Sequence, residues 1–182
     1  MTTTATTTST WTVDSAHSIA EFSVKHMMVS TVKGRFRDVT GTVSIDEEHP
    51  ERSSVTATIA AASIDTGVEM RDNHLRSGDF FEVEQYPALT FRSTSVEKVD
   101  DENWRIAGDL TIRDVTRPVV LETEYEGQIK DAFGKQRAAF TAKTQINRKD
   151  FGLNWNGPLE AGGVVVSDRV KIELHIAAVL AE

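Results

Sequence analysis

The residue types of a nucleophile, a base and an acid occur within five positions near the start of the chain, in Asp14-Ser15-Ala16-His17-Ser18. The members of a hydrolytic triad normally meet across a fold, and neighbouring residues of a strand point to opposite faces. Asp and Ser side chains at the start of a strand usually form hydrogen bonds with the local backbone. The segment therefore predicts a structural turn, and catalysis is its weaker interpretation.

A second group of chemically capable side chains occupies the stretch 71–77, RDNHLRS. Residues two positions apart do not face each other on a helix, so Asp72 cannot readily orient His74. Asp72 and Arg76 have the i,i+4 spacing of an ion pair on a helix surface, and Leu75 would anchor the helix. An enzyme is nevertheless kept as the alternative hypothesis. It would be a hydrolase or isomerase that acts on a lipophilic substrate through His17, His26, Arg71 and His74.

The histidines do not have the spacing of a metal site. There are five of them, and none forms an HxxxH or HExxH pair. A zinc site built from His17, His26 and His74 would need all three to converge in the fold. The chain has no cysteine, so disulfides and thiolate chemistry are excluded. We therefore expect no metal and no cofactor.

The size and charge of the chain narrow the function classes. With 182 residues, 39% hydrophobic and 26% charged, the composition is typical of one soluble globular domain. The formal net charge is −8, and an acidic chain repels phosphate backbones and anionic lipid surfaces. Nucleic acid is therefore not an expected partner.

The first ten residues, MTTTATTTST, have no hydrophobic periodicity. We expect residues 1–10 to be a disordered tail and residues 11–182 to form the domain. The start of the chain has neither the basic residues nor the apolar run of a signal peptide, and no stretch approaches the roughly 20 apolar residues that span a bilayer. These features predict a cytoplasmic protein without stable membrane insertion.

Apolar and polar residues alternate in many segments, among them 20–24, 55–59, 106–112 and 170–176. A period of two indicates half-buried strands. About eight such strands occur at hairpin-like spacing, which predicts an all-β antiparallel barrel.

Two stretches break the alternation. Residues 61–91 carry the charged segment 71–77 and the pair Phe80-Phe81, and we expect one short helix here, laid across an open end of the barrel. In all, the barrel is expected to carry one or two short helices. In the stretch 149–163, Phe151 and Trp155 have two interpretations: they plug the end of the barrel, or they gate a ligand.

The expected inward positions mix small residues with large aromatic ones. An eight-stranded barrel can be filled by side chains or can hold one slender ligand. The strand pattern alone favours a filled core, because most alternating strands merely pack. Since no central inward position carries a charge, the ligand of any cavity would be long and apolar. The small positions are Ala20, Gly34, Ala57, Gly108 and Ala142, and the large ones are Phe22, Phe36, Phe91 and Phe140.

Several motifs occur in a family-typical order over nearly the whole chain after residue 10. They are DSAHS at 14–18 with Phe22, Val24 and His26; GRF at 34–36 with Gly41; SIDT at 63–66; RDNHLRS at 71–77 with DFF at 79–81; Tyr86-Pro87 and Phe91; GDLT at 108–111 with Val115-Thr116; RKDFG at 148–152; and the last strand at 170–176. With these motifs the chain resembles the YceI-like, polyisoprenoid-binding proteins.

The resemblance implies a lipocalin-like antiparallel barrel that holds a polyisoprenoid or other long-chain amphiphilic lipid, with a quinone tail as one candidate. It implies non-catalytic binding, storage or transport, with no catalytic residue and no cofactor. The ligand-binding residues that it implies are Phe22, Val24, Phe36, Phe81, Phe91, Leu110 and Phe151. A third hypothesis keeps the lumen filled and places the function on the surface of a homodimer.

Overall fold

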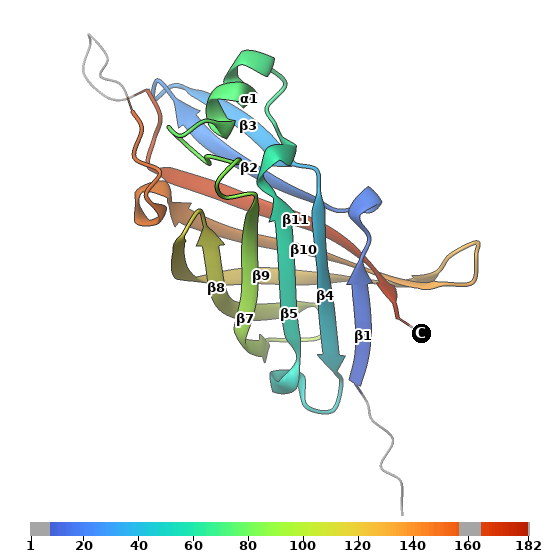
Figure 1. Ribbon diagram of the computed structural model, residues 1–182. Helices are drawn as coiled ribbons and strands as arrows, with labels where there is room; N and C mark the ends of the chain where they lie inside the picture. The colour runs from blue at the N-terminus through green and yellow to red at the C-terminus, as the bar shows by residue number, and fades with distance from the viewer. Residues whose placement is uncertain (1–7, 157–164, 182) are drawn as a thin grey trace, which may run out of the picture.

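The computed structural model describes residues 8–156 and 165–181 and is almost entirely β-structure (Figure 1). One α-helix, α1 (Glu69–Arg76), and four short 3-10 turns interrupt the strands in this part of the chain. The turns are η1 (Ser15–His17), η2 (Pro50–Arg52), η3 (Ala61–Ser63) and η4 (Arg148–Phe151). The strands are β1 (Thr8–Val13), β2 (Ile19–His26), β3 (Ser30–Phe36), β4 (Val39–Asp46), β5 (Ser54–Ala60), β6 (Ile64–Asp65), β7 (Ala88–Lys98), β8 (Asn103–Ile112), β9 (Val115–Lys130), β10 (Gln136–Asn147) and β11 (Arg169–Leu180).

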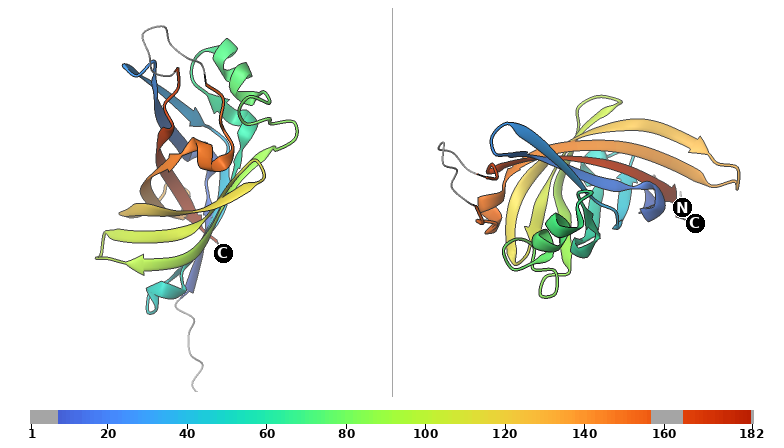
Figure 2. Two further views of the ribbon diagram at one scale, coloured as in Figure 1. Left: turned by 90° about the vertical axis from the view of Figure 1, so that its left-hand side faces the viewer. Right: turned by 90° about the horizontal axis from the view of Figure 1, so that it is seen from above.

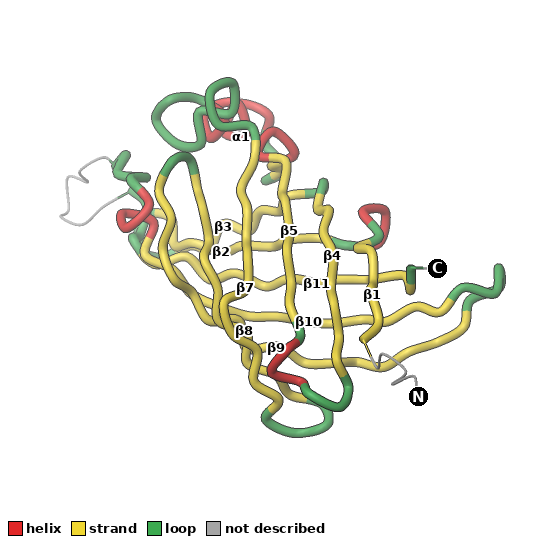
Figure 3. Tube along the Cα trace, turned by 60° about the horizontal axis from the view of Figure 1, so that its bottom comes forward, coloured by secondary structure: helices red, strands yellow, loops and turns green. Residues whose placement is uncertain are grey.

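Eight of the strands close an antiparallel barrel. Their order is β1-β4-β5-β7-β8-β9-β10-β11, and β1 pairs back onto β11 with Trp11 opposite Leu180. In Figure 3, β4, β5 and β7 cross in front of β10 and β11, so the barrel is flattened into two crossing walls. The predicted antiparallel barrel of about eight strands with a short helix is confirmed.

Three further strand segments extend the barrel wall toward α1. β2 pairs with β11 and with β3, and β3 pairs with the short β6. β2 continues the line of β1 after η1, β3 leads into β4, and β5 leads through η3 into β6. β11 belongs to both the closed barrel and its extension, since residues 178–180 pair with β1 and residues 171–175 pair with β2. The eleven described segments therefore form eight longer strands, of which three are interrupted.

The helix α1 lies across the extended end of the barrel (Figures 1 and 2). Leu75 of α1 and Phe81, which follows it, pack against the buried core at that end. This confirms the helix expected within residues 61–91. The fold places a short helix here because β6 ends at Asp65, and the chain returns to the barrel only with β7 at Ala88.

The start of the domain differs from the expected boundary. Thr8, Ser9 and Thr10 belong to β1 and pair with residues 44–46 of β4. The disordered tail predicted for residues 1–10 therefore extends three residues too far. Pairing with a neighbouring strand supplies backbone hydrogen bonds that local composition does not reveal. Residues 1–7 of the predicted tail lie outside the described residues, as do residues 157–164 of the predicted loop.

Candidate ligand-binding cavity

A cavity of about 500 Å³ occupies the inside of the barrel. Every strand of the closed barrel contributes to its lining, and β2, β3, α1 and the segment after α1 complete it. Most of the lining side chains are aliphatic or aromatic. The structure therefore contradicts the filled lumen that the strand pattern favoured. Strand alternation predicts which side chains face inward, but it does not predict whether their summed volume fills the space.

Six of the seven predicted ligand-binding residues line this cavity. An aromatic row forms its wall near α1: the rings of Phe22 and Phe36 lie 5.7 Å apart, and those of Phe36 and Phe81 lie 5.5 Å apart. The other lining residues of the set are Val24, Phe91 and Leu110. The seventh, Phe151, is 2% exposed within the core cluster that surrounds this end of the barrel and is not among the lining residues.

Two glycines let aromatic rings approach the barrel wall closely. A Cβ atom on Gly34 of β3 would overlap the ring of Phe22, and one on Gly108 of β8 would overlap the ring of Phe91. Glycine is the residue that permits such a close approach, because it has no Cβ. These pairings keep two large side chains close to the strands and leave the lumen open between them.

Sequence reasoning missed several lining residues at both ends of the cavity. Leu75, Phe80 and Leu153 come from the segments that cover the α1 end. Trp104 and Tyr125 lie toward the opposite end, near the β7–β8 turn. The strand period could have identified Trp104, which has the same parity as Ile106 and Leu110 on β8. The contributions of loop residues have no comparable signal.

Arg148 in η4 is the most deeply buried charged side chain of the described residues, with 3% exposure. Its guanidinium donates to four backbone carbonyls: Leu153 at 2.6 Å, Trp155 at 2.8 Å, Ser167 at 2.9 Å and Val166 at 3.1 Å. Burial lowers the pKa of Arg148 from its usual range. The side chain therefore holds the segments on either side of residues 157–164 to the barrel, and its donors are engaged by the protein itself.

The charged residues of α1 attach the helix to the chain that precedes it. The buried Asp72 accepts hydrogen bonds from the backbone N and the Oγ1 of Thr66, and Arg71 donates to the Oγ1 and the carbonyl of the same residue. Arg76 donates to the carbonyls of Ala62 and Ile64. The predicted surface ion pair between Asp72 and Arg76 is wrong, because Asp72 binds Thr66 in the connection before α1 while Arg76 binds carbonyls of η3 and β6.

The side chains of the alternative enzyme hypothesis are spread over separate parts of the fold. His17 pairs with Asp14 at 2.8 Å on η1, and its side chain is 69% exposed. Asp14 lies beside the far half of β11, where its backbone N donates to Ala177, whereas His74 and Arg71 lie on α1 at the opposite end of β2.

At the α1 end, His74 pairs with Asp79 at 2.8 Å and packs edge-on against Phe80. His26 ends β2, where its backbone pairs with Val166. The geometry therefore does not bring His17 to the other three residues. Over residues 8–156 and 165–181, no group of three His, Cys, Asp or Glu side chains is arranged to hold a metal ion.

Charged groups occur at the end of the cavity that faces away from α1. Glu47, Lys98 and Asp101 line it there. Lys98 pairs with Asp101 at 3.4 Å, and its ammonium lies 5.8 Å from the ring centre of Trp104. The lining is thus mostly apolar, with hydroxyl groups such as those of Thr123 and Thr144 along the strands and a cluster of charged groups at this end.

None of the helices among the described residues has the length and apolar composition needed to cross a bilayer.

Comparison with known proteins places this architecture in a family. The model of the YceI-like domain matches residues 11–178. A UPF0312 protein of Staphylococcus aureus (strain N315) is 41% identical over 164 residues, which cover 90% of this chain and 93% of that protein. Protein YceI of Escherichia coli O157:H7 is 44% identical over 137 residues, which cover 75% of this chain and 71% of that protein.

Solved structures with the same fold are found as well. The YCEI protein of Campylobacter jejuni has a TM-score of 0.74 at 33% identity, covering 87% of this chain and 90% of that one. BcnA of Burkholderia cenocepacia has a TM-score of 0.79 at 24% identity, covering 91% and 98%. A polyisoprenoid binding domain from Saccharophagus degradans has a TM-score of 0.68 at 16% identity, covering 94% and 98%. The last two show the fold alone. The family match over residues 11–178 and the relatives above 40% identity show that the chain belongs to the YceI-like domain family.

Proposed function

We propose that the protein binds a long apolar lipid inside its barrel, for storage or transport, and does not alter it chemically. A polyisoprenoid, or the isoprenoid tail of a quinone, is the ligand class that fits. The observation that carries the proposal is the cavity of about 500 Å³ with a predominantly aliphatic and aromatic lining. The same fold in a polyisoprenoid binding domain supports it.

The dimensions of the cavity suit an extended chain. Lining residues of β11 run from Val170 to Ile176, a length of roughly 20 Å at about 3.3 Å per residue. The volume lies in the range of about 300–1,000 Å³ that is usual for small-molecule sites. Burial of each CH2 group contributes about 0.8 kcal/mol, so a long chain can be held without a strong polar contact.

The proposal includes that the protein does not catalyse a reaction on the bound lipid. Arg71 and His74 are engaged with Thr66 and Asp79, and His17 is engaged with Asp14 on another element. A catalytic acid or base must be within hydrogen-bond reach of a substrate group. Among the described residues no histidine lines the lumen, and most of the lining is aliphatic or aromatic, which supports binding over hydrolysis or isomerisation.

Titration of delipidated protein tests the proposal. A long-chain polyprenol, an alcohol of several isoprene units and a single-unit isoprenoid alcohol are added separately, and the complexes are counted by native mass spectrometry. We expect one long chain per protein and affinity that rises with chain length, because each added unit buries further apolar surface. Equal affinity for the single-unit alcohol and the long chain, or no complex with either, would contradict the proposal.

A further inference from the structure

Exposed apolar side chains gather on two elements at the α1 end of the barrel. Met27, Met28 and Val29 form the β2–β3 turn and are 47%, 60% and 85% exposed. Val68 and Met70, at the start of α1, are 48% and 83% exposed. We call these five side chains the apolar rim. Both elements lie at the same end of the molecule in Figure 1.

Described contacts connect the two parts of the apolar rim around the end of the cavity. On the hairpin side, the backbone N of Met27 donates to the carbonyl of Val165 at 2.8 Å. On the helix side, the ring of Trp155 lies 4.9 Å from that of His74 and 5.4 Å from that of Phe80. Arg148 joins the two sides, since it donates to the carbonyls of Trp155 and Val166.

This ring of contacts belongs to the cavity itself. Phe80 and Val166 line the cavity, and so does Val24 on the strand that leads to the β2–β3 turn. The exposed apolar side chains therefore lie on elements that contact the lining of this end of the cavity.

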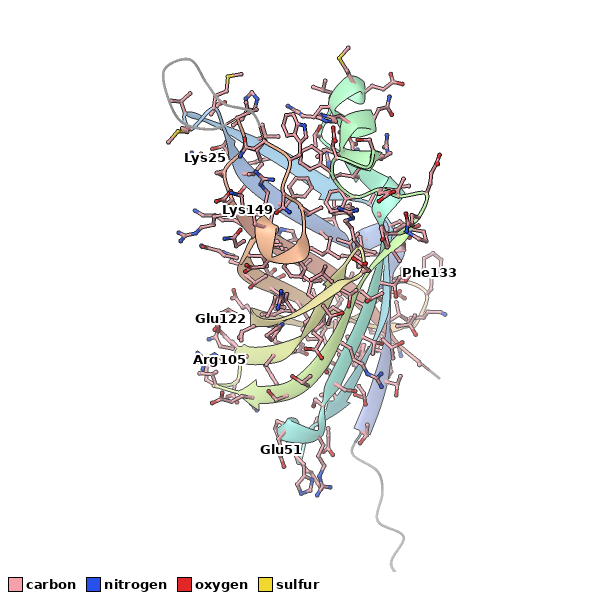
Figure 4. The ribbon with its side chains drawn as sticks, turned by 60° about the vertical axis from the view of Figure 1, so that its left-hand side comes forward. Lys25, Glu51, Arg105, Glu122, Phe133 and Lys149 are labelled. Atoms are coloured by element: carbon pink, nitrogen blue, oxygen red, sulfur yellow. The ribbon has the colours of Figure 1, made fainter. Side chains whose placement is uncertain are left out.

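The opposite end of the cavity has the reverse character. The β4–β5 and β7–β8 turns there carry six exposed carboxylates, Glu47, Glu48, Glu51, Asp100, Asp101 and Glu102. Figure 4 shows Glu51 at this end and Lys25 near the apolar rim. Among the described residues of these two turns, Val99 is the only exposed large apolar side chain. These carboxylates would lose their hydration on entering the interface of a bilayer, so this end is unsuited to a membrane surface.

A long isoprenoid resides in a bilayer, and its passage through water would expose its whole length. Apolar side chains on a turn or a short helix can enter the interface of a bilayer without any change of backbone, and methionine adapts readily to a fluid partner. We propose that the apolar rim docks the protein on an uncharged lipid bilayer and that the lipid enters the cavity through this end. The inference rests on the proposed function. It adds the end of the barrel through which the lipid enters and the bilayer from which the lipid comes.

Uptake from two donors tests the inference. The rim variant Val29→Glu/Met70→Glu is compared with Ile129→Glu/Phe133→Glu, which alters two equally exposed apolar side chains on the β9–β10 hairpin, 68% and 89% exposed. Phe133 projects from the other side of the molecule in Figure 4. Each protein receives a fluorescent long-chain polyprenol either from phosphatidylcholine vesicles or from detergent micelles. All four altered residues are exposed, so circular dichroism should show the wild-type fold in both variants.

We expect the rim variant to take up the lipid from vesicles about tenfold more slowly than wild type, with unchanged uptake from micelles, because only the vesicle must be contacted by the rim. The hairpin variant should match wild type with both donors. The inference is overturned, and the proposed function left standing, if the rim variant takes up the polyprenol from vesicles as fast as wild type. The same holds if the hairpin variant is slowed as much as the rim variant. A rim variant that only loses self-association assigns this surface to a second copy and also overturns it. Failure of the wild-type protein with both donors overturns the inference together with the proposed function.

Discussion

The ring of Phe22 on β2 lies against the backbone of Gly34 on β3, in the space that a Cβ atom of residue 34 would occupy. The two residues are directly paired across the strands. The ring is thereby kept at the wall of the lumen, 5.7 Å from Phe36. The width of the cavity near α1 thus depends on a glycine that is not itself among the lining residues.

Replacement of this glycine should narrow the cavity. In Gly34→Ala the ring of Phe22 must move into the lumen, and overpacking of this kind typically costs about 1–3 kcal/mol of stability. We expect a lower free energy of unfolding in urea and weaker polyprenol binding. The second substitution Phe22→Leu should restore part of both losses, since the smaller side chain leaves room for the methyl group. Gly78→Ala is the matched control, because a Cβ there would have no atom within 4 Å. Equal effects at residues 34 and 78 would contradict this view of the pair.

A charge in the middle of the lumen should abolish binding. Leu110 lines the cavity on β8, opposite Phe91 on β7. In Leu110→Lys a bound chain would have to cover an ammonium group, and desolvation of an unpaired charge costs several kcal/mol. We expect polyprenol affinity to fall at least about hundredfold by native mass spectrometry. Thr90→Lys, on the exposed face of the neighbouring strand, should bind as wild type. A fully loaded Leu110→Lys protein would show that the ligand lies elsewhere.

Arg148 should be essential for the covering segments rather than for the ligand. Arg148→Met removes a donor from four carbonyls, of which that of Val166 keeps a hydrogen bond from Asn156 Nδ2. Unsatisfied buried acceptors cost about 1–3 kcal/mol each, reduced by local rearrangement. We expect a loss of about 3 kcal/mol in the free energy of unfolding and faster hydrogen exchange at residues 153–156 and 165–168. Arg169→Met, at an exposed position of β11, should change neither measurement. Unaltered exchange in Arg148→Met would refute the role given to the guanidinium.

The ligand should carry an uncharged head group. Among the described residues, Lys98 and Arg148 are the only lining cations, and both are engaged, with Asp101 and with backbone carbonyls. The sequences of residues 1–7 and 157–164 contain no Lys or Arg. A diphosphate inside the cavity would therefore find no unengaged lining cation, and its desolvation would be uncompensated.

In a competition assay at equal chain length, we expect a polyprenol to bind at least about tenfold more tightly than the polyprenyl diphosphate. Tighter binding of the diphosphate would show that cations outside the described lining receive the head group.

Acid should weaken the attachment of η1 to β10. Asp14 accepts hydrogen bonds from Arg137 at 2.7 Å and from His17 at 2.8 Å, and these partners lower the pKa of Asp14 from 3.8 to about 2. Because the pKa is lower in the folded state, the stabilisation is complete above pH 4 and is lost as the pH falls toward about 2. We expect Asp14→Asn to lower the free energy of unfolding by about 1–2 kcal/mol at neutral pH and by much less near pH 2, measured in urea. A deficit that is the same at both pH values would argue against this ion pair.

The barrel and its inward faces could be predicted from the sequence because side chains alternate strictly along a strand. This rule places Phe22, Val24, Phe91 and Leu110 on the lumen side without any knowledge of the partner strands. The same rule does not reveal that the lumen is open. That property depends on how the strands close and on pairings such as Phe22 with Gly34, which join separate segments.

The hydrogen-bond partners of the buried polar residues could not be predicted from local sequence patterns. Asp72 has the spacing of a helix-surface ion pair, yet it is buried and binds Thr66, because the chain folds back before α1. Arg148 stands in a segment that reads as a surface loop, and its four carbonyl partners come from residues 153–167. The family resemblance implied Phe151 as a ligand-binding residue, but the turn η4 directs it into the packed core.

Extraction of the purified protein tests the central claim most directly. The recombinant protein is denatured in organic solvent, and the released material is identified and quantified by mass spectrometry, with the Leu110→Lys protein processed in parallel. The account predicts a long-chain, uncharged isoprenoid or related lipid in a ratio approaching one per wild-type chain, and almost none from the variant. Wild-type protein that releases no lipid, and that also stays empty after incubation with a long-chain polyprenol, would contradict it.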